Sequence, residues 1–230
     1  MKNYAIILAS GQGKRYGADI PKQFVKIAGK TVLEYTIEVF EKSSHIDEII
    51  LVITPEYRNL AQNIISDNNY KKVNKILNGG AIRKESSYIG VCAIEDDEAN
   101  VLIHDCARPF LSQKIISDCI EALDEHNAVA VAIPATDTIL EAKDGMVNSI
   151  LDRSKLMCVQ TPQCFKLSLI KKAHKLAKDD NNFTDDCGLI VKYNLSDVYI
   201  VQGSYQNIKI THKSDLYFME ALLRQENTSN

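Results

Sequence analysis

The sequence predicts an α/β fold in which helices cover one mostly parallel sheet, and two observations support this. Apolar runs rich in branched side chains recur along the chain, beginning with residues 4–9 and 48–53. Segments with helical spacing of apolar residues lie between these runs, so that strands and helices alternate. No shift in composition marks a linker, and residues 1–230 are therefore expected to form a single domain.

The expected elements follow one another in the order strand, helix, strand. Strands are predicted at residues 4–9, 48–53, 75–78, 100–104, 128–133 and 197–202, with a short one at 207–210. Helices are predicted at residues 32–42, 56–67, 83–94, 112–126, 168–178, 185–193 and 214–224.

Residues 137–150 interrupt this alternation. Apolar and polar residues alternate there on both sides of a Lys-Asp-Gly turn, which is typical of a β-hairpin. A two-stranded arm is only marginally stable alone, so we expect it to pack on another surface, which could be that of a second subunit.

Composition and charge exclude several classes of partner and cofactor. The 27 basic and 30 acidic residues are well mixed and give a net charge of −3, which provides no general attraction for nucleic acid or an anionic membrane. The apolar run at residues 5–9 is too short for a signal peptide, and no run is long enough to cross a bilayer. Six cysteines without a C-x-x-C pair and five histidines without metal-ligand spacing indicate free thiols, a cytoplasmic location and no structural zinc.

A glycine-rich segment follows the first predicted strand. Residues 8–17 are Leu-Ala-Ser-Gly-Gln-Gly-Lys-Arg-Tyr-Gly, and Pro-Lys-Gln follows around Lys22. Gly11 and Gly13 let the backbone turn sharply and present its N–H groups to phosphate oxygens, while Arg15 and Lys22 add positive charge. Phosphoryl transfer depends on such positioned cations. The segment matches neither a P-loop nor a dinucleotide fingerprint, and a bare G-x-G also occurs in ordinary tight turns.

A second polar segment begins where an apolar run ends. Residues 101–109 are Val-Leu-Ile-His-Asp-Cys-Ala-Arg-Pro, with Asp105 directly after the predicted strand. Ligands of open α/β sheets lie beyond the carboxyl ends of the strands, and Mg²⁺ prefers one or two carboxylates together with substrate phosphates. Asp105 is therefore a candidate magnesium ligand. The alternative is a structural ion pair between Asp105 and Arg108 that closes the loop.

Two further segments each allow a functional and a structural interpretation. Residues 79–86, Gly-Gly-Ala-Ile-Arg-Lys-Glu-Ser, form a glycine turn that opens a helix, and such an N-terminus can accept an anionic or carbonyl group. Alternatively, Ser86 simply faces water. Lys209 lies between two isoleucines on a predicted strand, so its side chain points away from theirs, toward a ligand or toward solvent. Segments that look like caps or turns by themselves are 152–154, 160–163 and 184–186.

Together and in this order, these segments resemble the cytidylyltransferase family that acts on 2-C-methyl-D-erythritol 4-phosphate and D-ribitol 5-phosphate. The resemblance runs from about Tyr4 to Leu216. It implies a Rossmann-like nucleotidyltransferase fold, dependence on Mg²⁺, and a homodimer whose protruding arm helps complete the partner's acceptor site. It also implies that CMP is transferred from CTP to the phosphate of a polyol phosphate, with release of pyrophosphate.

The resemblance implies a role for each residue at a matching position. The catalytic residues, which stabilise the α-phosphate, would be Arg15, Lys22 and Lys209. The residues that bind CTP would be Ala9, Ser10, Gly11, Gly13, Gly80, Ala81, Ser86, Asp105 and Ala107, with Asp105 also holding Mg²⁺. The residues of the acceptor pocket would be Asp137, Thr138, Arg153, Thr161 and Thr184. Because the attacking phosphate oxygen is already ionised, no side chain need act as general base.

The sequence leaves the acceptor open between two polyol phosphates. Residues 152–156 and 159–163 resemble the methylerythritol branch, whereas Met157 and residues 205–207 resemble the ribitol branch. We favour 2-C-methyl-D-erythritol 4-phosphate, which gives 4-diphosphocytidyl-2-C-methyl-D-erythritol in the non-mevalonate pathway of isoprenoid synthesis. The alternative is D-ribitol 5-phosphate, which gives CDP-ribitol for cell-surface polymers. Ser10 stands where the family more often has Gly or Ala, and it is tolerated if its side chain turns away from the phosphates.

Two other classes of function fit fewer of these features. A sugar-nucleotide binding or regulatory protein could keep the fold without the chemistry, but retention of Arg15, Lys22, Asp105 and Lys209 argues against it. A nucleotidyltransferase that uses UTP, GTP or ATP on a hexose 1-phosphate would differ in its base specificity, which assays with each nucleotide distinguish.

Overall fold

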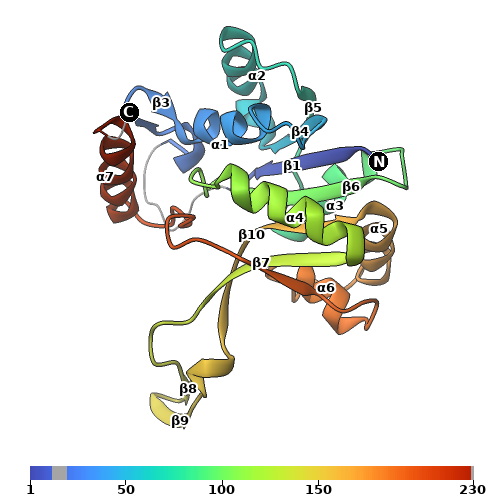
Figure 1. Ribbon diagram of the computed structural model, residues 1–230, viewed down its shortest axis with the longest axis vertical. Helices are drawn as coiled ribbons and strands as arrows, with labels where there is room; N and C mark the ends of the chain where they lie inside the picture. The colour runs from blue at the N-terminus through green and yellow to red at the C-terminus, as the bar shows by residue number, and fades with distance from the viewer. Residues whose placement is uncertain (12–19, 229–230) are drawn as a thin grey trace.

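A seven-stranded sheet lies between two layers of helices in the computed structural model, which describes residues 1–11 and 20–228 (Figure 1). The strands of this sheet are β1 (Asn3–Ala9), β4 (Glu48–Ile53), β5 (Val73–Asn78), β6 (Asn100–Asp105), β7 (Ala128–Pro134), β10 (Met157–Lys166) and β11 (Tyr199–Gln202). Their order across the sheet is β11-β7-β10-β6-β1-β4-β5. The neighbours of β1 and the outer pairs β4–β5 and β11–β7 are parallel, which confirms the predicted α/β fold.

One central strand, β10, runs antiparallel to both of its neighbours, β6 and β7. Residues 160–163, which look like a turn in the sequence, lie buried inside this strand. Pro162 has no N–H to donate to a sheet ladder, and a proline inside a sheet is tolerated at a bulge. The register with β7 shifts between Val159 and Gln163, and the Thr161–Pro162 peptide bond is cis. The interpretation of this segment as a loop is therefore wrong.

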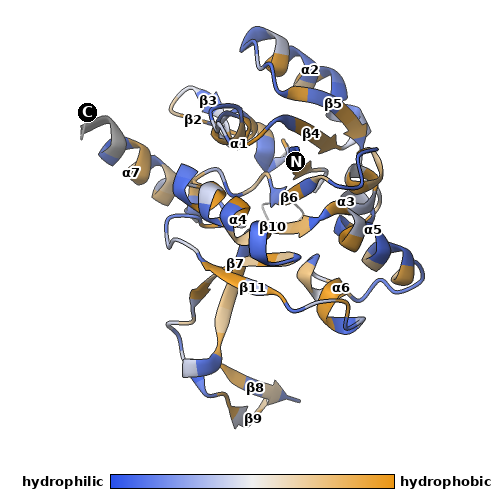
Figure 2. Ribbon diagram, turned by 45° about the vertical axis from the view of Figure 1, so that its right-hand side comes forward, coloured by the Kyte–Doolittle hydropathy of each residue, from blue (hydrophilic) through white to orange (hydrophobic). Residues whose placement is uncertain are grey.

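Helices cover both faces of the sheet because residues next to each other on a strand point to opposite sides. On one face lie α1 (Val32–Glu41), α2 (Arg58–Asp67) and α4 (Gln113–Glu125), which pack on side chains such as Ile7 and Leu51. On the other face α3 (Arg83–Cys92), α5 (Leu167–Leu176) and α6 (Cys187–Lys192) pack on Ile6 and Ile50. Figure 2 shows apolar colour along the sheet and mixed colour on the helices that cover it.

Smaller elements surround this core. They are η1 (Lys22–Phe24), β2 (Lys26–Ile27), β3 (Lys30–Thr31), η2 (Pro55–Tyr57), η3 (Arg153–Lys155) and α7 (Ser214–Thr228). Helix α7 packs through Met219 on Ile27 and Val32. No helix among the described residues is long and apolar enough to span a bilayer.

The predicted hairpin is confirmed. Strands β8 (Leu140–Lys143) and β9 (Met146–Ile150) pair antiparallel and protrude from the rest of the molecule (Figure 1). The turn between them places Asp144 at a φ of 54° and Gly145 at a φ of 80°, a conformation that aspartate and glycine tolerate better than most residues.

The predicted strand at 207–210 is not formed. The segment is a loop that passes the carboxyl end of β6, where the Ile210 N–H donates to the Ala107 carbonyl at 2.8 Å. The Arg108 guanidinium donates to the Asn207 carbonyl at 2.8 Å. These contacts run to a loop and a side chain rather than to a neighbouring strand, so the segment does not join the sheet.

Candidate active site

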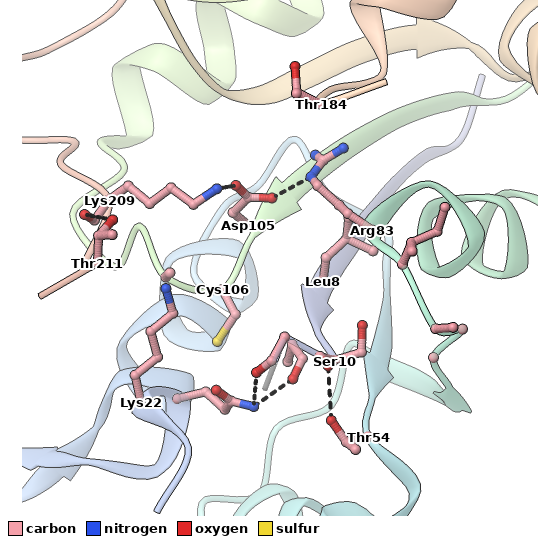
Figure 3. A pocket seen from close by; sticks show the side chains of 18 of the residues that line it. Leu8, Ser10, Lys22, Thr54, Arg83, Asp105, Cys106, Thr184, Lys209 and Thr211 are labelled. Carbon is pink, nitrogen blue, oxygen red and sulfur yellow. Dashed lines mark hydrogen bonds and ion pairs between the residues drawn. The ribbon is translucent and has the colours of Figure 1, made fainter. Parts of the chain in front are cut away.

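A pocket of about 830 Å³ opens at the carboxyl ends of β1 and β6 (Figure 3). This is the end of an open α/β sheet at which ligands bind. The predicted site residues that line it are Ala9, Ser10, Gly11, Lys22, Gly80, Ala81, Asp105, Ala107, Thr184 and Lys209. Segments that lie far apart in the sequence therefore meet at one pocket.

The other predicted site residues lie elsewhere. Gly13 and Arg15 fall outside the described residues, and their part in the site stays a prediction. Asp137 and Thr138 are exposed at the start of the 137–150 segment, and Arg153 donates to the Thr136 carbonyl at 2.7 Å. These three residues are not part of the pocket lining, and their contact with an acceptor stays a prediction.

Asp105 lies in the pocket between two cations. Its Oδ1 accepts from Arg83 Nε at 3.0 Å and its Oδ2 accepts from Lys209 Nζ at 2.6 Å. Burial raises the pKa of this carboxyl, but the two neighbouring positive charges lower it more, and the net pKa is well below the usual range. Asp105 is therefore a carboxylate at neutral pH.

Arg108 does not form the ion pair that the sequence suggested as an alternative. Its guanidinium donates to the Asn207 carbonyl at 2.8 Å and to the Val159 carbonyl at 3.4 Å, while Asp105 pairs with Arg83 and Lys209 instead. Arg108 thus joins the 207–210 loop to β10, and this loop carries Lys209.

Thr161 supports Asp105 from behind the pocket. Its Oγ1 accepts from the Asp105 N–H at 3.1 Å and lies 3.1 Å from His104 Nδ1. His104 Nε2 lies 2.9 Å from the Arg108 carbonyl, which can only accept, so Nε2 carries the proton and Nδ1 accepts from the threonine hydroxyl. Burial lowers the pKa of His104 to about 4, and the ring is neutral at neutral pH. The Thr161 side chain is buried and is not part of the pocket lining. Its role as an acceptor contact stays a prediction.

Lys22 and Lys209 lie along one side of the pocket, and Ser10 and Thr54 along another (Figure 3). Lys22 Nζ donates to the Ile210 carbonyl at 2.5 Å, directly after Lys209. Gln23 fixes the short helix that carries Lys22, because its buried amide donates to the Ala9 carbonyl at 2.8 Å. The interpretation of Lys209 as a solvent-facing residue is wrong, since its ammonium contacts Asp105 in the pocket.

The turn before α3 is held closely against the loop after β1. Ser86 Oγ accepts from the Gly80 N–H at 3.1 Å and lies 2.7 Å from Ser10 Oγ. The Ser86 side chain is buried, so the alternative in which it faces water is wrong. The Ser10 side chain turns toward α3, and whether it also turns away from the phosphates of a bound nucleotide stays a prediction. Helix α3 begins at Arg83, so its N-terminal end opens on the pocket.

Several lining residues were not found from the sequence. Thr54 donates to the Ser10 carbonyl at 3.1 Å, and it follows β4 at the same sheet edge, a position that could have signalled it. Cys106 and Thr211 are neighbours of predicted residues. Arg83 belongs to a segment that the sequence singled out, but no local signal indicates its partners.

The donor set fits a magnesium ion only if substrate oxygens complete the coordination. Among the described residues there is no cluster of three or more histidine, cysteine, aspartate or glutamate side chains that could hold a metal. Mg²⁺ commonly binds through one or two carboxylates plus substrate phosphates, and Asp105 supplies one such carboxylate in the pocket.

Comparison with known proteins shows which family the chain resembles in sequence and in fold. Residues 4–225 match the family model of 2-C-methyl-D-erythritol 4-phosphate cytidylyltransferase. The chain is similar to the protein of that name from Clostridium acetobutylicum, with 41% identity over 97% of this chain and 98% of that protein. It is also 42% identical to the bifunctional ribulose 5-phosphate reductase/CDP-ribitol pyrophosphorylase Bcs1 of Haemophilus influenzae, over 97% of this chain but only 48% of that protein. The crystal structure of 4-diphosphocytidyl-2C-methyl-D-erythritol synthase from Anaerococcus prevotii is similar with a TM-score of 0.85 and 30% identity, covering 97% of this chain and 96% of that one.

Proposed function

The chain belongs to the 2-C-methyl-D-erythritol 4-phosphate cytidylyltransferase family, and from this premise we propose that it transfers CMP from CTP to 2-C-methyl-D-erythritol 4-phosphate. The products are 4-diphosphocytidyl-2-C-methyl-D-erythritol and pyrophosphate. This reaction belongs to the non-mevalonate pathway of isoprenoid synthesis. The protein is accordingly a nucleotidyltransferase.

The observation that carries the proposal is that two lysines, a buried carboxylate and two glycine-containing turns meet at one pocket. Its volume of about 830 Å³ lies in the range of about 300–1,000 Å³ that is usual for small-molecule sites. The lysines are Lys22 and Lys209, and the carboxylate is Asp105. Positive charges and backbone N–H groups bind the oxygens of a triphosphate. Nucleotidyl transfer requires both around the same phosphates, where they stabilise the charge that develops in the reaction.

In the proposed reaction, an oxygen of the acceptor phosphate attacks the α-phosphorus of CTP, and the bond to pyrophosphate breaks. Lys22, Lys209 and Arg15 stabilise the charge that develops on the α-phosphate and the leaving group. The Lys209 ammonium has three donors, and among the described residues Asp105 accepts from one of them, so the other two are available to phosphate oxygens. The attacking oxygen is ionised beforehand, and no side chain has to remove a proton.

We assign recognition of the cytosine to the turn at Gly80 and Ala81 together with Ser86. Support for this comes from the hydrogen bond between the Gly80 N–H and the buried Ser86 hydroxyl, which holds the turn at the edge of the pocket. A rigid backbone edge can distinguish the hydrogen-bond pattern of cytosine from those of other bases, because a mismatched polar group would remain unpaired.

We also propose that Asp105 holds Mg²⁺ together with the phosphates of CTP. When bound, the ion would supply positive charge that offsets the charge of the triphosphate. Asp105 would orient Lys209 and the triphosphate toward each other. Pyrophosphate release that stops on addition of a chelator and returns with Mg²⁺ would support this assignment. Release that is unaffected by chelation would contradict it.

We further propose a homodimer built through the arm of residues 137–150. Met146 and Ile150 on β9 are 74% and 70% exposed in the single chain, and Leu140 and Val147 on the same arm are exposed as well, so large apolar side chains gather there. Asp137 and Thr138 at the start of the arm and Arg153 just after it lie outside the pocket lining of their own chain. An arm that reaches a second subunit would bring these polar residues to the partner's acceptor site.

The function is tested by measuring pyrophosphate release with Mg²⁺ and each of CTP, UTP, GTP and ATP, with either 2-C-methyl-D-erythritol 4-phosphate or D-ribitol 5-phosphate. We expect the highest kcat/KM with CTP and 2-C-methyl-D-erythritol 4-phosphate. Faster turnover of D-ribitol 5-phosphate would overturn the acceptor and leave cytidylyl transfer in place. Preference for another nucleotide would overturn the base assignment. Nucleotide binding without release from any pair would indicate a binding protein.

A further inference from the structure

One guanidinium joins the pocket to the buried interior behind it. Arg83 lies in the first turn of α3, and its Nε donates to Asp105 Oδ1 at 3.0 Å while its Nη1 donates to Asp186 Oδ2 at 2.7 Å. The third nitrogen, Nη2, is buried and has no hydrogen-bond partner among the described residues. Figure 3 shows the guanidinium beside Asp105, on the side of the pocket where Thr184 lies. Arg83 is thus held by two carboxylates from distant parts of the chain.

Asp186, the second ion-pair partner of Arg83, is buried and held by several hydrogen bonds. Its side chain is 1% exposed, and its Oδ1 accepts from Ser87 Oγ at 2.5 Å. Its backbone N–H donates to Gln163 Oε1 at 2.7 Å, which ties it to the central strand β10. Asp186 is thus held through both its backbone and its side chain, and it offers Arg83 a partner in a fixed place.

The connection continues from Asp105 to Lys209. Since Arg83 holds Oδ1 of Asp105, the carboxylate presents Oδ2 to Lys209 at 2.6 Å. A guanidinium is planar and has donors in fixed directions, so it can hold two carboxylates at a set angle. A lysine at position 83 would keep the charge but could not reproduce these two directed contacts. Loss of this geometry would let Asp105 rotate and carry Lys209 with it.

We propose that Arg83 is a positioning residue for nucleotidyl transfer, which holds the Asp105 carboxylate, and through it Lys209, by tying it to the buried Asp186. The inference rests on the proposed function, because it concerns the step in which Lys209 contacts the α-phosphate. Arg83 need not contact the substrate in this role. Its side chain affects the reaction through Asp105.

This role predicts a specific kinetic pattern. Arg83→Lys lowers kcat by about 10- to 100-fold, the range typical for residues that orient a metal-binding side chain such as the one proposed for Asp105. The KM for CTP changes by less than about threefold, because the contacts of Gly80 and Ser86 do not involve the guanidinium. A merely structural role of Arg83 at the start of α3 would instead loosen that turn and raise the KM for CTP, with kcat close to the wild-type value.

The experiment compares Arg83→Lys, Asp186→Asn and the double variant with wild type, and uses Arg224→Lys on the exposed face of α7 as the matched control. Both single variants lower kcat, and the double variant is no slower than Arg83→Lys, because both residues act through the same contact. Independent, multiplicative losses would overturn the proposal. So would wild-type kcat in Arg83→Lys.

A second measurement separates positioning from folding. In Arg83→Ala, guanidinium ions restore part of kcat at concentrations that leave the unfolding midpoint unchanged, whereas urea at the same concentrations does not. Absence of rescue at a temperature at which Arg83→Ala is still folded counts against the proposal. If wild type itself releases no pyrophosphate with CTP and either acceptor, the proposed function fails. A wild-type enzyme that is active while Arg83→Lys is equally active refutes the role of Arg83 alone.

Discussion

The hydroxyl of Ser10 lies 2.7 Å from the hydroxyl of Ser86, although 76 positions separate the two residues in the chain. The first belongs to the loop after β1 and the second to α3, so this contact joins the predicted phosphate-binding segment to the turn assigned to cytosine. The backbone at Gly79 passes close to both. A Cβ added there would lie 2.3 Å from the Ser10 Cβ and 3.0 Å from Ser86 Oγ.

This close approach predicts that Gly79→Ala separates the two loops. We expect a higher KM for CTP and a loss of about 1–3 kcal/mol in the free energy of unfolding, as for other overpacked sites. Removing the Ser10 side chain makes room, so Ser10→Gly should recover part of both losses in the Gly79→Ala background. Steady-state kinetics and urea unfolding of the four combinations measure this. Strictly additive effects of the two substitutions would show that the clash is not the cause.

Lys22→Ala should lower kcat by about 10²–10³-fold, the scale of losing one preorganised contact to a transition state. The reason is that Lys22 lines the pocket next to the loop of Lys209, where we propose that its ammonium stabilises the α-phosphate. Lys26→Ala, which removes an exposed lysine from neighbouring β2, is the control and should leave kcat within about twofold. Turnover of Lys22→Ala near the wild-type value would remove Lys22 from the mechanism.

Much of the fold follows from local patterns. The run of five branched apolar residues at 49–53 is typical of a buried strand, and it forms β4. The alternation of apolar and polar residues around Lys-Asp-Gly is typical of a hairpin, and it forms β8 and β9. The strand β10 was missed because Thr161-Pro162 is typical of a turn, whereas its burial between β6 and β7 depends on strands distant in sequence. The two isoleucines around Lys209 suggested a strand, but Ile210 is buried against α7 and β2 instead.

The candidate site was predictable where it lies at strand ends. Lys22, Asp105 and Ser86 each follow a motif that ends a strand or opens a helix, and the sheet brings such ends to one edge. The link between Arg83 and Asp186 was not predictable, because 103 positions separate them and their meeting depends on how α3 packs against the start of α6. Long-range ion pairs of this kind leave no periodic signal in the sequence.

Asp186 should also contribute to stability in a pH-dependent way. Burial raises the pKa of this carboxyl, but the Arg83 charge and the His174 and Ser87 side chains lower it more, to about 2. An unfolded aspartate has a pKa of about 3.9, so the folded value is depressed. The contribution is therefore fully present above about pH 5 and is lost as the pH falls toward 2, and its size is on the order of 2 kcal/mol.

Asp186→Asn should accordingly lower the free energy of unfolding at pH 7 and weaken its dependence on pH between 5 and 2. Urea unfolding across this range measures both effects. Asp124→Asn, on the exposed face of α4, should keep the pH dependence of wild type. Equal slopes for wild type and Asp186→Asn would mean that another acidic group dominates acid unfolding.

The arm provides a test of assembly. Burying a large apolar side chain contributes about 1.5–3 kcal/mol, so Met146 and Ile150 can stabilise a dimer only if a partner covers them. Ile150→Asp should therefore shift the protein toward monomer in light scattering, while Lys143→Ser on the same arm should not.

If the arm completes the partner's acceptor site, Ile150→Asp should also raise the KM for the acceptor tenfold or more and leave CTP affinity nearly unchanged. A wild-type protein that is monomeric at assay concentrations would contradict both expectations, because the acceptor site would then have to be complete within one chain.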